Sequence, residues 1–433
     1  MRTETLDNGL RVLLDPRPDS PVTGIAVHYD VGFRSEPEGR TGFAHLFEHL
    51  MFQGSENVAR GEHFRHVQAS GGTANAATHH DHTDYHQLVP PAALERVLFL
   101  EADRMRALRI SAENLRTQVA VVQEEIRLQV TNRPYGGFPW TVLPGVLYET
   151  FPNAHNGYGD LRELERATVA ECEAFFAAHY TPANAVLTIS GPLDPDHALT
   201  LVHRHFGDIP AHPAAPRPRL AEPPPRGERR GEHRDPHAPL PAVALGYRMP
   251  DPAAELGDYL AHMVLARLLA GGDDARLRRR LVHDGTVTSV RASCGFFGPL
   301  QARDPDTFLL VAHHPPTTDP EAVPSAVDEE LDRLAATGPH PRELSHATAR
   351  ASTALCRSYD EPLTRTRHAG TFALLHGSPN LVTDLPTLLT QVTPESVAHA
   401  AKTLRSAGRA VLTLVPGGSP FGLPAPDCRR GRP

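Results

Sequence analysis

The chain has 433 residues, 40% of them hydrophobic, which predicts two or three globular domains with real cores. Its formal net charge of -8 offers no basic face for phosphates and so argues against a nucleic-acid partner. No stretch approaches the ~18 apolar residues that span a bilayer, and residues 1–14 lack the features of a signal peptide, so we expect a cytoplasmic protein with no membrane partner.

The spacing of the four cysteines indicates no functional site. Cys172, Cys294, Cys356 and Cys428 are far apart in the sequence and form no Cys-x-x-Cys pair. This spacing argues against a disulfide framework and against a cysteine-bound metal. We expect reduced thiols that are buried or inert.

The first half of the chain alternates between strand and helix patterns. The Asn-Gly pair in "LDNGLRVLLD" fits a tight turn between two short strands, and a further strand is expected from Thr23 to Val31. Residues 73–90, "TANAATHHDHTDYHQLVP", alternate and are rich in threonine, which favours a strand. Helices are expected over residues 42–52, 61–69, 92–107 and 114–129. This mixture indicates an α+β fold.

The first of these helices carries charge inside an apolar run, "GFAHLFEHLMF", where burial is costly unless something compensates. His45 and His49 are four residues apart, so both imidazoles lie on one helix face and can take two corners of a tetrahedral zinc site. Glu48 lies beside them. It is more useful there as a general base for a metal-bound water than as a ligand, because a catalytic site keeps one position open.

A third ligand has to come from elsewhere in the chain. The helix "LRTQVAVVQEEIRLQV" offers Glu125, which is in step with the apolar face, and Glu124, which points more to the side. A lone His-x-x-Glu-His motif can also arise by chance on a salt-bridged surface helix. The nearby histidines 79, 80, 82 and 86 divide between the faces of an alternating strand, so we expect surface or rim positions for them.

The two halves of the chain are similar in sequence pattern, which indicates an internal duplication. Residues 211–240 are dominated by proline, arginine and charged residues, which predicts a linker between an N-terminal domain, 1–210, and a C-terminal domain, 241–433. The two halves end alike, in "NAVLTISGPLD" and "RAVLTLVPGGS", and each opens with a strand pattern followed by an apolar helix. The second helix carries only His262, so the zinc motif belongs to the first domain.

These motifs resemble a known family. "HLFEHLMFQGS", followed by the glutamate of "VVQEEIR", is similar to the inverted zinc peptidases of the pitrilysin and insulinase family, and the resemblance extends over nearly the whole chain. Within the family it resembles a short two-domain bacterial subunit similar to the catalytic subunit of the mitochondrial processing peptidase. The family implies two homologous α+β domains, each a mainly antiparallel sheet packed with helices, which together form half of a clamshell.

The resemblance also implies residue roles. His45, His49 and Glu125 would bind Zn²⁺, and Glu48 would be the catalytic base of an endopeptidase that hydrolyses extended, flexible peptides, as in leader or presequence removal. Asn75 and Ala76 would lie on an exposed edge strand that pairs with the substrate backbone. An ordinary edge strand is the alternative for these two residues.

Two departures from the family pattern bear on activity. Gln118 stands where an acid usually supports a ligand histidine; it can still donate a hydrogen bond but adds no negative charge. Leu281 and Thr288 stand where an Arg and a Tyr reach the substrate in other members. We therefore expect a homologous partner subunit that supplies this pair, in a heterodimer rather than a homodimer.

Two other functions compete with a peptidase subunit. One is a non-catalytic scaffold or assembly subunit, and the other is a module that binds peptides without cutting them. Non-catalytic relatives usually lose a histidine or the base, whereas this chain keeps His45, Glu48, His49 and Glu125. The intact set favours the peptidase.

Overall fold

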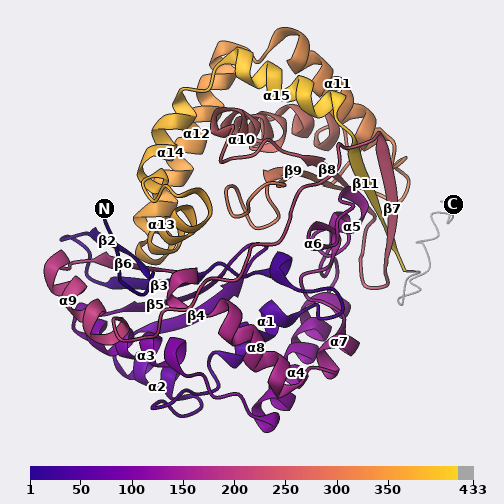
Figure 1. Cartoon of the computed structure of the whole chain (residues 1–433). Helices are drawn as coiled ribbons and strands as arrows, with labels where there is room; N and C mark the ends of the chain where they lie inside the picture. The colour runs from indigo at the N-terminus through magenta and orange to yellow at the C-terminus, as the bar shows by residue number, and fades with distance from the viewer. Residues whose placement is uncertain (418–433) are drawn as a thin grey trace, which may run out of the picture.

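The computed structural model describes residues 1–417, and each half of the chain forms one mixed sheet covered by helices (Figure 1). The first sheet has six strands in the order β1-β2-β6-β3-β5-β4, and the second has five in the order β7-β11-β8-β10-β9. Most neighbouring strands are antiparallel; β2 with β6 and β11 with β7 are the parallel pairs. The predicted α+β fold with two domains is confirmed.

The N-terminal half contains strands β1 (Arg2–Thr5), β2 (Arg11–Pro16), β3 (Thr23–Tyr29), β4 (Thr73–Thr78), β5 (Thr83–Val89) and β6 (Ala185–Gly191). Its helices are α1 (Phe43–Leu50), α2 (Glu62–Ala69), α3 (Leu94–Arg106), α4 (Ala112–Ile126), α5 (Leu143–Leu147), α6 (Phe151–Ala154), α7 (Leu161–Glu165), α8 (Val169–His179) and α9 (Pro195–Phe206). The four helices and the first strands predicted in this half are all present, with ends shifted by a few residues.

The C-terminal half contains strands β7 (Glu228–Asp235), β8 (Ala242–Arg248), β9 (Ser289–Cys294), β10 (Thr307–His313) and β11 (Arg409–Pro416). Its helices are α10 (Leu256–Ala270), α11 (Ala322–Thr337), α12 (Pro341–Asp360), α13 (Pro362–His376), α14 (Leu381–Thr390) and α15 (Pro394–Ser406). The two sheets share one topology: β2, β6, β3, β5 and β4 pair in the same order and sense as β7, β11, β8, β10 and β9. This correspondence is what a duplication produces.

Two sequence predictions need correction. The expected linker, 211–240, contains β7, which pairs in parallel with β11 and is the counterpart of β2. The strand was missed because it is an edge strand whose "ERRGEHRD" sequence is polar on both faces. Residues 73–90 form two strands instead of one, since the chain turns between β4 and β5, where the N–H of His79 donates to the carbonyl of His82 over 2.8 Å.

The two halves pack against each other through exchanged helices (Figure 1). Helix α13 of the C-terminal half lies on β3 and β6 of the first sheet, and α5 of the N-terminal half lies on β7, β8 and β11 of the second. The contact around α5 is apolar, with Leu143 and Leu147 beside Ala244 and Leu412. Burial of this apolar area stabilises the contact between the halves.

Within residues 1–417 no helix is long and apolar enough to cross a membrane. Cys172, Cys294 and Cys356 are free thiols, of which the first two are buried and Cys356 is exposed. Cys428 lies outside the described residues.

Candidate metal centre

Helix α1 begins after a glycine in the left-handed backbone region, and its first turn is hydrogen-bonded to a buried carboxylate. Its first turn follows Gly42, which has a φ of 86°, where a residue with a Cβ would be strained. The N–H groups of Gly42 and Ala44 donate to the buried carboxylate of Glu36, each over 2.8 Å. The Nε2 of His155 lies 3.1 Å from the same carboxylate. The carboxylate thus accepts from two N–H groups at the start of the helix and complements the helix dipole.

His45, His49 and Glu125 meet at the face of α1 that looks toward α4. The Nε2 of His45 lies 3.5 Å from Oε1 of Glu125, and the Nε2 of His49 lies 3.3 Å from Oε2. The two imidazole rings are perpendicular, at 89°, with centroids 5.1 Å apart. Ligands of one tetrahedral zinc ion, bound at ~2.0–2.2 Å, are themselves separated by roughly 3.3–3.6 Å. The donor set and its spacing therefore fit a zinc ion.

Helix α4 presents one carboxylate of its Glu pair to the histidines. Val122 and Ile126 are buried on the inner side of α4, and Glu125 lies beside them with about a third of its side chain exposed. Glu124 points to solvent, where it pairs with Arg127. The structure thus brings together the three residues nominated from the sequence and leaves Glu124 outside.

Charges around the three side chains are coupled. Hydrogen bonding to His45, and then to His49, holds the pKa of Glu125 well below its usual range. Burial lowers the pKa of His45, but the carboxylates of Glu125 and Glu48 outweigh burial and raise it. Glu125 therefore stays ionised, which is the form that ligates a metal.

Glu48 is held by the edge strand rather than by the histidines. The hydroxyl of Thr78, the last residue of β4, donates to its carboxylate over 2.6 Å. This bond fixes the carboxylate beside the His45–His49 pair and links α1 to β4. The role of Glu48 as a base stays a prediction.

Strand β4 is the edge of the first sheet and pairs only with β5 within the described residues. Asn75 is exposed, and Ala76 is buried with its side chain toward the opposite face, so the two contribute differently. The free backbone edge can accept another extended chain. Whether substrate binds there stays a prediction.

Gln118 is buried on α4, before Glu125 in the chain. Neither imidazole receives a hydrogen bond from it in the structure, and the buried Nδ1 of His45 has no partner within the described residues. Its supporting role for a ligand histidine also stays a prediction.

Tyr158 is a neighbour of the site that the sequence did not reveal. Its ring contacts the ring of His45, with centroids 5.2 Å apart, and the ring of Trp140, with centroids 4.9 Å apart. Burial, and then the charges of Glu125 and Glu48, raise the pKa of its hydroxyl. The loop before α7 that carries it has no motif, so only packing could place this tyrosine at the site.

The two positions that depart from the family pattern do not offer donors. Leu281 is buried in the core of the C-terminal half. The hydroxyl of Thr288 donates to the carbonyl of His313 over 3.0 Å and is occupied by that bond.

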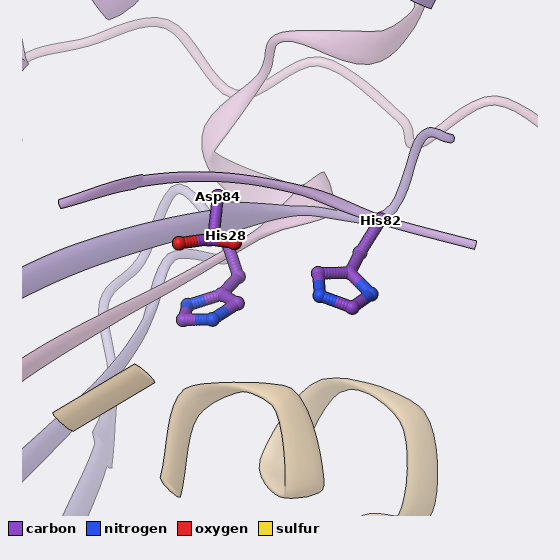
Figure 2. Close-up of side chains that lie close together, drawn as sticks. All are labelled: His28, His82 and Asp84. Atoms are coloured by element: carbon purple, nitrogen blue, oxygen red, sulfur yellow. The ribbon is translucent and has the colours of Figure 1, made fainter. Parts of the chain in front are cut away.

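A second group of ligand-type side chains lies on the other face of the first sheet: His28, His82 and Asp84 (Figure 2). This group corrects the expectation of surface histidines, because His79, His82 and His86 are all buried. They are buried because α13 of the C-terminal half covers this face of the sheet. The residue pattern of one strand cannot show which helix packs on it. His80 is half-buried.

Comparisons with known proteins agree with this geometry. The chain matches the family model described as Insulinase (Peptidase family M16) over residues 11–134 and that described as Peptidase M16 inactive domain over residues 166–350. It is 30% identical to the zinc protease PqqE of Helicobacter pylori over 333 residues, which are 76% of this chain and 73% of that protein. It is 22% identical to the mitochondrial-processing peptidase subunit beta of Saccharomyces cerevisiae over 57% of this chain and 50% of that protein.

Solved structures show the same fold. A protease from Helicobacter pylori superposes with a TM-score of 0.87 at 25% identity, over 96% of this chain and 99% of that one. The periplasmic protease PqqL from Escherichia coli superposes with a TM-score of 0.74 at 20% identity, over 96% of this chain but 47% of that one. The chain therefore has the fold of about half of PqqL.

Proposed function

The chain belongs to the insulinase family of peptidases, family M16, and is a zinc protease by this homology; from that premise we propose that it is an endopeptidase subunit acting on extended, flexible peptides. Removal of leader peptides or presequences is the substrate class we propose. The observation that carries the proposal is the meeting of His45, His49 and Glu125 from two helices, with Glu48 held beside them.

Each residue has a physical part in the proposed reaction. His45, His49 and Glu125 would hold the zinc ion, which supplies a Lewis acid and lowers the pKa of water. Glu48 takes a proton from the attacking water and returns it to the leaving amine. The hydroxyl of Thr78 keeps the Glu48 carboxylate pointed at the site.

The edge of β4 is our proposed binding place for the peptide backbone. A peptide that pairs with β4 must be extended, which excludes folded segments and makes main-chain hydrogen bonds the main source of affinity. Asn75 is exposed on this strand, and Thr78 at its end touches Glu48, so a peptide bound along β4 would run toward the base.

The alternative is a scaffold or peptide-binding subunit without catalysis. Such a subunit has no need of a zinc-ligand set with a carboxylate fixed next to it. Because the described residues retain both, the peptidase is the function that we propose.

The test compares Glu48→Gln with the unchanged chain. Glu48 is not among the three clustered ligands, so the variant should keep its zinc while hydrolysis of a quenched fluorescent peptide library falls about 10²- to 10⁴-fold. Glu124→Gln, an exposed neighbour of Glu125, is the matched control and should retain full activity. Near-normal turnover by the Glu48 variant would overturn the proposal, and so would a chain that binds no zinc.

We further propose that a homologous partner chain completes the active enzyme as a heterodimer. Support comes from Leu281 and Thr288, whose side chains offer no free donor to a developing oxyanion. Such donors contribute ~2.7–4 kcal/mol each to transition-state binding. Turnover by the isolated chain should therefore be low and rise about 100-fold or more with the partner, at constant zinc content. Full activity in a homodimer, verified by light scattering, would contradict this.

A further inference from the structure

The cluster of His28, His82 and Asp84 lies away from the zinc-binding motif, between the first sheet and α13 (Figure 2). His28 on β3 is directly opposite Asp84 on β5 in the strand register. His82 precedes Asp84 by two residues and therefore faces the same side of the sheet. The rings of His28 and His82 both point toward the helix that covers them.

All three side chains are buried, and the two imidazoles lack hydrogen-bond partners that Asp84 has. His28 and His82 have no exposed surface, and Asp84 has 1%. Both ring nitrogens of His28 and the Nδ1 of His82 have no hydrogen-bond partner within the described residues. A buried polar atom without a partner costs about 1–3 kcal/mol, so a native protein rarely keeps several together without an ion or water to satisfy them.

The free ring nitrogens of the two imidazoles suit a metal ligand. A neutral imidazole offers a lone pair on one ring nitrogen, and neither nitrogen of His28 nor the Nδ1 of His82 is engaged in a hydrogen bond within the described residues. Asp84, directly opposite His28 in the strand register, brings a carboxylate to the same place.

We propose that His28, His82 and Asp84 bind a second transition-metal ion, with Zn²⁺ as the first choice. Two imidazoles and one carboxylate form a set that suits zinc, cobalt and nickel. Their ligand atoms lie within 4.8 Å of one another, whereas the ligands of one zinc ion are roughly 3.3–3.6 Å apart. The carboxylate of Asp84 is already held by the guanidinium of Arg367 and by the Nδ1 of His86. The second ion should therefore bind more weakly than the first.

Arg367 on α13 competes with this ion for Asp84. Its Nε lies 2.8 Å from Oδ2 and its Nη2 lies 3.0 Å from Oδ1. About a third of the Arg367 side chain is exposed, so it can turn to solvent when a cation takes the carboxylate. Occupancy of the second site would then remove an ion pair between the two halves of the chain.

Because Arg367 competes with the ion, its removal should strengthen metal binding at the second site. Arg367→Gln removes the competing positive charge and should tighten the second ion by about tenfold. His28→Leu removes a ligand and two unpartnered nitrogens at once, so the folded, metal-free chain should be retained while the second site is lost.

The experiment titrates the metal-free chain with Co²⁺ and then with Zn²⁺, and follows cobalt absorption and the stoichiometry by calorimetry. The chain should bind two ions, His49→Ala and His28→Leu should each bind one, and the double variant should bind none. A single equivalent in the unchanged chain that disappears in His49→Ala and survives in His28→Leu would overturn the proposal. The proposal also fails if the second equivalent survives His28→Leu or if Arg367→Gln leaves its affinity unchanged. No readout depends on peptidase activity, so failure here and failure of the proposed function are separate results.

Discussion

Replacement of Glu125 by glutamine should release zinc from the first site, while the same replacement at Glu124 should not. In the structure both oxygens of Glu125 face imidazole nitrogens, at 3.3 and 3.5 Å. Glu124, one residue earlier, is exposed and pairs with Arg127. The two variants change the same chemistry on the same helix and differ only in the direction of the side chain. Glutamine and glutamate have similar helix propensities, so α4 should remain intact in both.

The expected magnitude follows from electrostatics. Two unit charges 4 Å apart attract each other by about 4 kcal/mol at an effective dielectric constant of 20, which suits a partly exposed site such as that of Glu125. At about 1.4 kcal/mol for each tenfold change, the loss of this carboxylate should weaken zinc binding by about 10²- to 10³-fold. An exposed pair such as that of Glu124 contributes at most about 1 kcal/mol and does not face the histidines, so its loss should change zinc affinity less than about threefold.

The assay is competition with a chromophoric chelator of known affinity, with circular dichroism to verify that each variant is folded. If Glu124→Gln weakens zinc as much as or more than Glu125→Gln, then the assignment of the third ligand is wrong. If both variants keep full affinity, His45 and His49 bind without help from α4.

Three further predictions concern stability. Glu36→Gln should lower the free energy of unfolding by about 2 kcal/mol in urea, because the carboxylate accepts from two N–H groups at the start of α1 and from His155; an unchanged midpoint would contradict this. Gly370→Ala should cost about 1–3 kcal/mol in thermal unfolding, because a Cβ there would lie 2.4 Å from the ring of His28. Burial lowers the pKa of His179 to about 4. Between pH 6.5 and pH 4 the unfolded chain therefore binds a proton that the folded chain does not, and the free energy of unfolding falls by about 1.4 kcal/mol per pH unit as pH is lowered. Urea titrations at several pH values should show that His179→Gln makes this loss less steep.

The local sequence determined the zinc-binding helix and the duplication. A four-residue spacing puts His45 and His49 on one helix face whatever surrounds the helix, and the period of the apolar residues in α4 favoured Glu125 over Glu124. The similar ends of the halves are the matching central strands β6 and β11, which the sequence shows because buried strands are strongly patterned.

Tertiary structure alone decided which polar residues are buried. The histidines of β5 and the turn before it looked like rim residues because a strand pattern specifies two faces but not what covers them, and here α13 arrives from the other half of the chain. For the same reason the sequence could not show that His28 and Asp84 would be opposite each other, or that Tyr158 would contact His45. Periodicity within one element fixes the direction of a side chain; contacts between residues distant in the chain depend on how whole elements pack, and no local pattern encodes that packing.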